Sequence, residues 1–258
     1  MRRALFLSVA MLAQPALAGD WLPEMELRPQ ADWTGAYVGA TGGAGISAGR
    51  AKLDHAEGVL IPFDIGYGLF PHGIRDSSAG VAAGVSAGIN FQSGAFVGGI
   101  EADIGYVSTK AHHGFSRLDD THNIAPLDIH TNTRYETSFG MIGTLRARGG
   151  YAFGNTLLFG TAGIAAGDVG NRFQLAMPEI GYASPDWSAS GLRLGYVIGA
   201  GVEHRLTDAI SFKFETLYLN LADRVVKAVD PAAFPGESIS YRFTNDVVMP
   251  RFGMNVKF

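Results

Sequence analysis

Acidic and basic residues alternate with apolar residues in several segments of this sequence, so charged side chains gather on one face of each segment. Counted from the nearest predicted turns, Glu215 lies level with Arg251, and Glu101 lies level with Arg146. If these segments are strands that close into a narrow barrel, the charges on its inner face must pair, because an unpaired buried charge is very costly. The predicted inner network consists of Glu101, Asp103, Glu136, Arg146, Arg148, Arg193, Glu203, Lys213, Glu215 and Arg251.

Two functions are compatible with this network. The lumen of an eight-stranded barrel is just wide enough to be filled by side chains, so the favoured interpretation is a structural plug of salt bridges. The alternative is a narrow, gated polar path for small solutes. Three further cations, Arg134, Arg205 and Lys257, share the same predicted faces.

Histidines form a second group that could do chemistry. Six of the seven fall in two predicted connections, at His55, His72, His112, His113, His122 and His130. Because neutral imidazole is the commonest metal ligand, His112, His113 and His122 beside Asp119 and Asp120 could bind a metal ion or haem. Their spacing matches no fixed motif, and solvated loop histidines are the favoured interpretation. We therefore predict no cofactor and no metal.

Catalysis has little support in the sequence. A nucleophile or base must lie within hydrogen-bond reach of its partner, and Asp119 and Asp120 near His122 are the only local candidates. No lipase or protease signature is present. We predict that the chain is not an enzyme.

Apolar residues recur with a period of two, which is typical of β-strands with one apolar face. At the C-terminus, the even positions from Val248 to Phe258 are apolar, apart from Pro250, which is expected at a bulge or at the upper rim. The same period predicts eight strands, near residues 33–47, 80–91, 96–106, 134–148, 157–168, 191–203, 210–218 and 248–258.

The predicted connections alternate in length. Short turns fall at residues 92–94, 153–155 and 207–208, and long connections near residues 49–79, 109–133, 169–188 and 223–243. Short turns at one end and long loops at the other are typical of bacterial outer-membrane barrels. Strands of this length can cross a bilayer when tilted and are long for a β-sandwich, while a soluble lipocalin-like barrel is the alternative.

The first 18 residues have the pattern of a cleaved signal peptide. Arg2 and Arg3 precede an apolar run at residues 4–13 and an A-x-A site at residues 16–18. We predict a signal peptide at 1–18, a periplasmic lead-in at 19–32 and a barrel at 33–258.

The composition limits the classes of partner and the kinds of cross-link that the protein can have. Removal of the signal peptide leaves 18 basic against 24 acidic residues, which argues against nucleic acid. The absence of cysteine excludes disulfides and thiolate metal sites. The 35 glycines lie within the alternating segments, as the crowded interior of a narrow barrel requires.

Seven short stretches occur in an order that resembles a known family. They are WTGAYVG (33–39), GIEADIGY (99–106), GTLRAR (143–148), LLFGTAG (157–163), GAGVE (199–203), FKFE (212–215) and RFGMNVKF (251–258). The sequence resembles the small outer-membrane β-barrel proteins of alphaproteobacteria, called porin-family or OmpA-like barrels. The resemblance implies residence among outer-membrane lipid and lipopolysaccharide, and assembly by the barrel-insertion machinery through Phe258. It implies no shared biochemical activity.

We therefore predict an all-β fold, an eight-stranded antiparallel up-and-down transmembrane barrel with four long extracellular loops and short periplasmic turns. The predicted function is that of a structural and surface protein supporting envelope integrity. The alternatives are a small-solute channel and a receptor whose loops bind haem, metal or an unidentified extracellular ligand.

Overall fold

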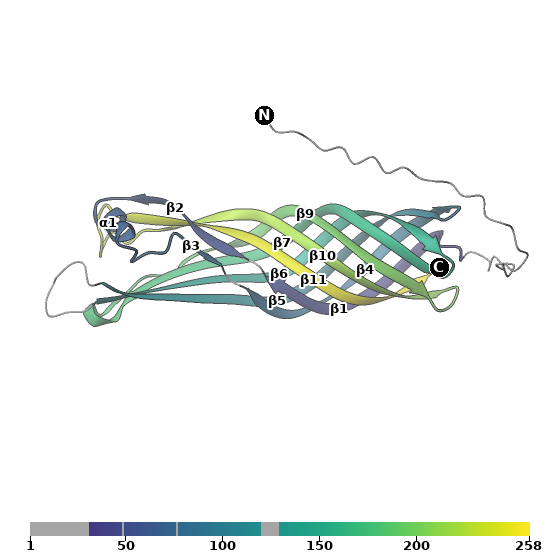
Figure 1. Cartoon of the computed structure of the whole chain (residues 1–258), viewed down its shortest axis with the longest axis horizontal. Helices are drawn as coiled ribbons and strands as arrows, with labels where there is room; N and C mark the ends of the chain where they lie inside the picture. The colour runs from purple at the N-terminus through teal and green to yellow at the C-terminus, as the bar shows by residue number, and fades with distance from the viewer. Residues whose placement is uncertain (1–30, 48, 76, 120–128) are drawn as a thin grey trace, which may run out of the picture.

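The chain forms one closed antiparallel β-barrel (Figure 1). The computed structural model describes residues 31–47, 49–75, 77–119 and 129–258, so the predicted signal peptide and most of the lead-in lie outside the described residues. Eight long strands close the ring through the pairing of the first with the last, which confirms the predicted fold class. They are β1 (Gly35–Ser47), β4 (Ser78–Ser93), β5 (Phe96–Asp119), β6 (Ile129–Phe153), β7 (Thr156–Met177), β9 (Trp187–Arg205), β10 (Ile210–Ala228) and β11 (Ser238–Lys257).

Short elements complete the end of the barrel that carries the long connections. Strand β2 (Arg50–Glu57) continues β1 along β11 in the same register, and β3 (Gly73–Arg75) pairs with β2. The other short elements are α1 (Leu60–Gly66), η1 (Pro178–Ile180) and β8 (Tyr182–Ala183). No helix in the described part of the chain is long and apolar enough to span a membrane.

The opposite end carries the short turns and the C-terminus (Figure 1). Gly94 and Gly154 occupy two of these turns with φ values of 61° and 58°. Tight hairpins need this left-handed conformation, which glycine adopts without steric cost.

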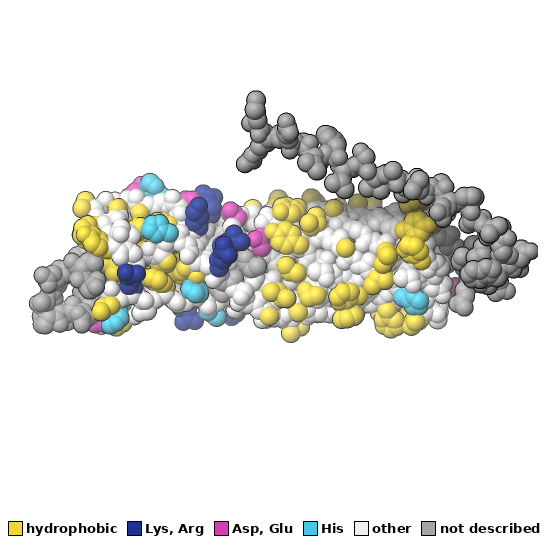
Figure 2. Space-filling view, viewed as in Figure 1, with side chains coloured by type: hydrophobic (Ala, Val, Ile, Leu, Met, Phe, Trp, Pro, Cys, Tyr) yellow, Lys and Arg dark blue, Asp and Glu magenta, His cyan; other side chains and the backbone are white. Residues whose placement is uncertain are grey.

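An apolar belt surrounds the half of the barrel nearest the short turns (Figure 2). Outward residues such as Val81, Ile104 and Phe252 are more than half exposed to solvent in the isolated chain. Aromatic residues mark its edges, with Phe91, Phe96, Phe153 and Phe258 near the short turns and Tyr106 and Tyr196 farther up. An apolar band bordered by aromatic girdles is typical of membrane-spanning barrels.

The pattern is inverted in the other half, where apolar residues point inward and charged residues point outward. Strand β6 has a bulge at Gly140 and Met141, which together oppose Asp168 of β7. One extra residue moves all later side chains to the opposite face. Tyr135 is therefore 2% exposed inside the barrel, and Glu136 lies on the outer face.

Strand β10 has a second bulge with the same effect. Ala222 and Asp223 together oppose Thr244 of β11. Beyond this point Val226 is buried and Lys227 is exposed, although odd-numbered positions point inward in the lower part of the strand.

The strands extend well into the predicted long connections. β5 continues to Asp119, β7 to Met177 and β10 to Ala228, while β11 already begins at Ser238. Outward residues are apolar only within the belt, because lipid surrounds the strands only there. Beyond each bulge, the positions that pointed inward point outward, so the apolar residues fall on the other set of positions. The regular pattern that identifies the lower strands is therefore lost in their upper parts.

Layers of side chains fill the lumen, and β11 contacts them in order from the short-turn end. Arg251 belongs to a charged layer, Met249 to an apolar layer, Asn245 to a polar layer and Tyr241 to an aromatic core at the far end. The ladder between β1 and β11 skips the two positions opposite Met249 and Pro250 and resumes in the same register. Pro250 has no N–H and therefore marks a gap in the hydrogen bonding between β11 and β1. It does not lie at a bulge or at the upper rim, the two positions that the sequence predicts.

Candidate functional site

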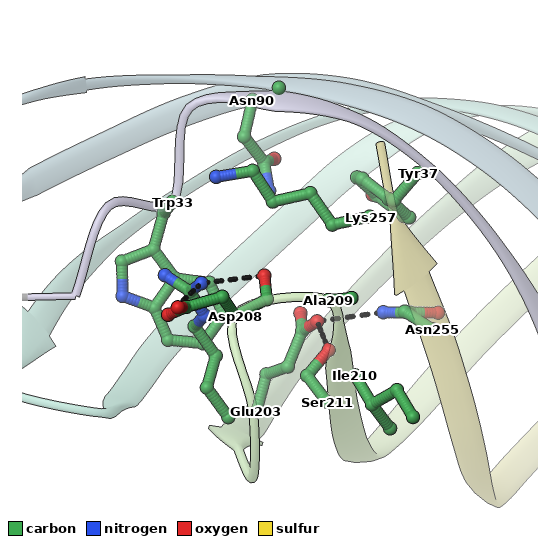
Figure 3. A pocket seen from close by; sticks show the side chains of 12 residues that line it. Trp33, Tyr37, Asn90, Glu203, Asp208, Ala209, Ile210, Ser211, Asn255 and Lys257 are labelled. Carbon is green, nitrogen blue, oxygen red and sulfur yellow. Dashed lines mark hydrogen bonds and ion pairs between the residues drawn. The ribbon is translucent and has the colours of Figure 1, made fainter.

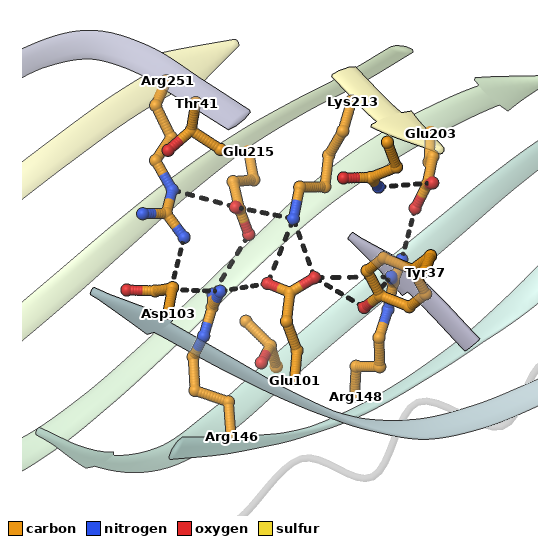
Figure 4. A network of polar contacts seen from close by, with 12 residues as sticks. Tyr37, Thr41, Glu101, Asp103, Arg146, Arg148, Glu203, Lys213, Glu215 and Arg251 are labelled. Carbon is orange, nitrogen blue, oxygen red and sulfur yellow. Dashed lines mark hydrogen bonds and ion pairs between the residues drawn. The ribbon is translucent and has the colours of Figure 1, made fainter. Parts of the chain in front are cut away.

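Arg146 is the centre of the charged layer in the lumen (Figure 4). Its Nη1 lies 3.1 Å from Oε2 of Glu215, and its Nη2 lies 2.7 Å from Oδ2 of Asp103 and contacts Glu101. Arg251 binds Glu215 through Nε at 2.9 Å and Asp103 through Nη2 at 2.7 Å. Three carboxylates are thus bridged by two guanidinium groups.

Lys213 and Arg148 extend the network toward the short-turn end. Nζ of Lys213 lies 2.9 Å from Oε2 of Glu101 and 3.1 Å from Oε1 of Glu215. Nη2 of Arg148 lies 2.7 Å from Oε2 of Glu203, and its guanidinium stacks over the ring of Phe159 at 4.2 Å. The planar guanidinium suits both kinds of contact.

Three uncharged residues bind the remaining carboxylate oxygens. Tyr37 donates its hydroxyl to Glu101 at 2.6 Å and accepts from Nη1 of Arg148 at 2.9 Å. Ser211 and Asn255 donate to Oε1 of Glu203 at 2.6 and 2.7 Å. The sequence did not identify these three residues, because a lone hydroxyl or amide at an inward position has no distinctive pattern.

The layer is electrically balanced. Four carboxylates, those of Glu101, Asp103, Glu203 and Glu215, face four cations, those of Arg146, Arg148, Lys213 and Arg251. Their side chains are at most 7% exposed. Complete pairing offsets the cost of removing the charges from water. The structure thus brings together eight of the ten residues predicted for the network.

Glu136 and Arg193 lie apart from this layer. Because of the β6 bulge, Glu136 lies on the outer face beside His112, with 3.3 Å between carboxylate and ring nitrogen, and Arg134 is also outward. Arg193 pairs in register with Gly167, above the charged layer, and has no ion-pair partner among the described residues.

The short-turn end of the lumen is closed by the end of the lead-in (Figure 3). Trp33 is buried against Leu157 and Phe159, and its backbone N–H donates to Gln92 at 2.7 Å. Arg205 holds the backbone oxygen of Asp32 and lies over the Trp33 ring at 5.7 Å. The remaining cavity is about 20 Å³, roughly the room one water needs.

An apolar layer closes the lumen on the other side of the charges. It includes Val197, Leu217, Leu219 and Val247, each fully buried. A charged layer covered by an apolar layer on one side, and by Trp33 with polar residues such as Arg205 on the other, suits rigid closure of a lumen, whereas a solute path needs a continuous wet surface.

The predicted histidine site is divided between two faces of β5. His112 pairs in register with the outward Glu136, whereas His113 pairs with the inward Tyr135. Neighbouring residues in a strand point to opposite faces, so these rings cannot ligate one ion. His122 lies outside the described residues, within which no group of three or more potential ligands could hold a metal ion.

Zinc titration tests this division. A His112→Ala/His113→Ala variant is expected to bind Zn²⁺ with the affinity of the wild type in isothermal titration calorimetry, since the two rings do not converge. The His122→Ala variant serves as the comparison. A substantial loss of affinity in the double variant alone would contradict the division.

A carboxylate joins two extracellular connections at the end of the barrel opposite the short turns. Glu237 accepts hydrogen bonds from the backbone N–H groups of Val59, Leu60 and Ile61, which enter α1, at 2.8, 3.0 and 3.0 Å. These three donors stabilise the charged form and lower the pKa of Glu237. Because its folded pKa is below its unfolded value, the contact stabilises the loop above the unfolded pKa and is lost as pH falls through the folded pKa.

Hydrogen exchange measures this contact directly. The protection factors of amides 59–61 are expected to fall as pH drops through the lowered pKa of Glu237, and to be low at every pH in Glu237→Ala. Asp54→Ala, which removes an exposed carboxylate of β2, is the control and should leave these factors unchanged. Full protection in Glu237→Ala would show that the contact does not hold the loop.

The chain is similar in sequence to known outer-membrane proteins. A family model described as "Outer membrane protein beta-barrel domain" matches residues 4–243. The chain is 28% identical to the 31 kDa outer-membrane immunogenic protein of Brucella melitensis, over 100% of both chains. It is 29% identical to the 22 kDa outer membrane protein of Rhizobium leguminosarum bv. viciae, over 76% of this chain and 67% of the relative.

Two solved structures of outer-membrane proteins match the chain at low sequence identity. OprG from Pseudomonas aeruginosa is 13% identical, with a TM-score of 0.43 over 89% of this chain and 99% of that chain. The outer membrane protease OmpT from Escherichia coli is 10% identical, with a TM-score of 0.46 over 86% and 97%.

Proposed function

The chain belongs to the outer membrane protein beta-barrel family, and from this we propose that it is a structural and surface component of the outer membrane whose lumen does not conduct solutes. The observation that carries the proposal is the balanced layer of four carboxylates and four cations, which lies between an apolar layer and the Trp33 end of the lumen. The Brucella melitensis relative is named as an outer-membrane immunogenic protein, which fits a chain that presents surface at the cell exterior. Beyond the apolar belt, the strands continue as an extracellular wall that surrounds an aromatic core, and this wall suits such a role.

Planar-bilayer recording tests the closed lumen. The folded wild-type barrel is expected to give no stable single-channel steps above a detergent blank, because the apolar layer and the paired charges leave no continuous polar path through the lumen. Insertion is checked by protease resistance of the same sample after reconstitution. Stable, reproducible steps from inserted protein would overturn the proposal in favour of a small-solute channel.

The contribution to the envelope is tested in cells. Loss of the gene is expected to increase sensitivity to detergent, and the wild-type chain should restore resistance. If the proposal holds, a variant altered only in the outward Arg134 restores it equally. Unchanged sensitivity after loss of the gene would contradict a role in envelope integrity.

We also propose that Phe258 is a contact for the barrel-insertion machinery. Phe258 is 78% exposed at the short-turn end, and its backbone N–H donates to Ala36 at 3.0 Å. Phe258→Ala should therefore fold normally in detergent but accumulate poorly in the outer membrane. Normal accumulation would remove this role.

A further inference from the structure

Strand β2 carries cations that lie directly opposite cations of both neighbouring strands. Arg50 pairs in register with Arg75 of β3, and Lys52 pairs with Arg242 of β11. All four side chains are exposed on the outer face. Like charges directly opposite each other destabilise an antiparallel pair, so this arrangement needs a compensating anion.

The protein supplies only part of that compensation. Arg242 donates from Nε and Nη2 to Oδ1 of Asp54 at 3.0 and 2.7 Å. Arg50, Lys52 and Arg75 have no ion-pair partner among the described residues. By contrast, two other outward cations above the belt are paired, Lys227 with Glu57 at 3.2 Å and Arg172 with Asp186 at 4.0 Å.

The cluster lies at the outer border of the apolar belt. Arg50 follows the outward Ile46 of the belt by four residues along the continuous line of β1 and β2, which is about 13 Å along a strand and less in height because the strands tilt. Figure 2 shows Lys and Arg side chains gathered beside the belt, over β2 and β3. The headgroups of the outer leaflet occupy this level.

We propose that Arg50, Lys52, Arg75 and Arg242 bind the phosphorylated headgroup of an outer-leaflet glycolipid. Guanidinium groups match phosphate oxygens in a bidentate manner, and the lysine adds a point charge. A bound phosphate relieves the repulsion within both like-charged pairs. The belt below the cluster provides the apolar surface that the acyl chains of the same lipid require.

Equilibrium binding of fluorescent diphosphorylated lipid A to the full folded chain in neutral detergent tests the site. Arg50→Gln/Lys52→Gln/Arg75→Gln is expected to weaken binding at least about tenfold, since several charge-assisted hydrogen bonds are lost. The control Arg134→Gln/Arg172→Gln/Lys227→Gln removes the same charge elsewhere on the wall and should weaken it less than about twofold. Arg50→Lys/Arg75→Lys should retain part of the affinity.

A stability measurement guards against misfolding of the triple variant. In lipid-free detergent this variant should unfold at higher urea than wild type, because the repulsion is removed, and lipid A should stabilise the wild type and the control more than the triple variant. Equal loss in the control, or no loss in the triple variant, would overturn the site. Competition by millimolar inorganic phosphate as effective as that by lipid A would overturn the lipid as its occupant.

Discussion

Replacing Arg146 by alanine is expected to lower the free energy of unfolding by roughly 3 to 5 kcal/mol. The guanidinium is fully buried and bridges Glu101, Asp103 and Glu215, so its removal leaves three carboxylates short of positive charge in the lumen. Urea unfolding in detergent micelles, followed by tryptophan fluorescence, measures the change. The residual partners Lys213 and Arg251 cannot replace it, because both already bind Glu215.

The control lies on the same strand. Arg134 is exposed on the outer face of β6, and Arg134→Ala should change the unfolding free energy by less than about 0.5 kcal/mol. Adding Glu215→Gln to the Arg146 variant should cost less than the sum of the two single changes, because the two residues are coupled. Similar effects of Arg146→Ala and Arg134→Ala would contradict the central role of the buried network in stability.

Introducing a charge into the apolar belt is expected to be nearly as costly. Ile100 is 55% exposed on the outer face of β5, between Phe96 and Tyr106 at the two edges of the belt. Ile100→Arg should lower stability in lipid vesicles by roughly 2 to 4 kcal/mol, the cost of an arginine on the lipid face near the bilayer centre.

Ser116→Arg is the matched control for this change. Ser116 is also outward on β5, but it lies in the upper half, where the outer face is polar and charged. Its substitution should leave stability in the same vesicles almost unchanged. If Ser116→Arg proved as damaging as Ile100→Arg, the border between the membrane and the exposed wall would be placed wrongly.

The lower half of the barrel was readable from the sequence. Outward aliphatic and aromatic residues alternate there with inward charges and small residues. Because the turns are short, counting residues from each turn gives the register of the two strands that it joins. The ion pair of Glu215 with Arg251 and that of Glu101 with Arg146 therefore lie where this counting places them. Lipid outside and a crowded lumen inside impose opposite chemistry on neighbouring positions, and this contrast is visible in one dimension.

The upper half was not readable in the same way. The bulges at Gly140 and Ala222 exchange the inner and outer faces, so Tyr135 and Glu136 occupy faces opposite to those predicted. A bulge is a property of the ladder between two strands, and no periodic signal in one strand announces it. Water also replaces lipid outside, so the apolar outward pattern ends although the strand continues.

The sequence by itself determined the class of barrel, the number of strands, the apolar belt and most of the charged layer, because each depends on period-two alternation within a strand. Only the tertiary structure decided that Trp33 closes the short-turn end of the lumen and that Tyr37 and Asn255 complete the charged network. It also decided that Arg50 of β2 lies directly opposite Arg75 of β3. These contacts join residues distant in the chain. Their geometry follows from ring closure and strand stagger, which are properties of the whole barrel.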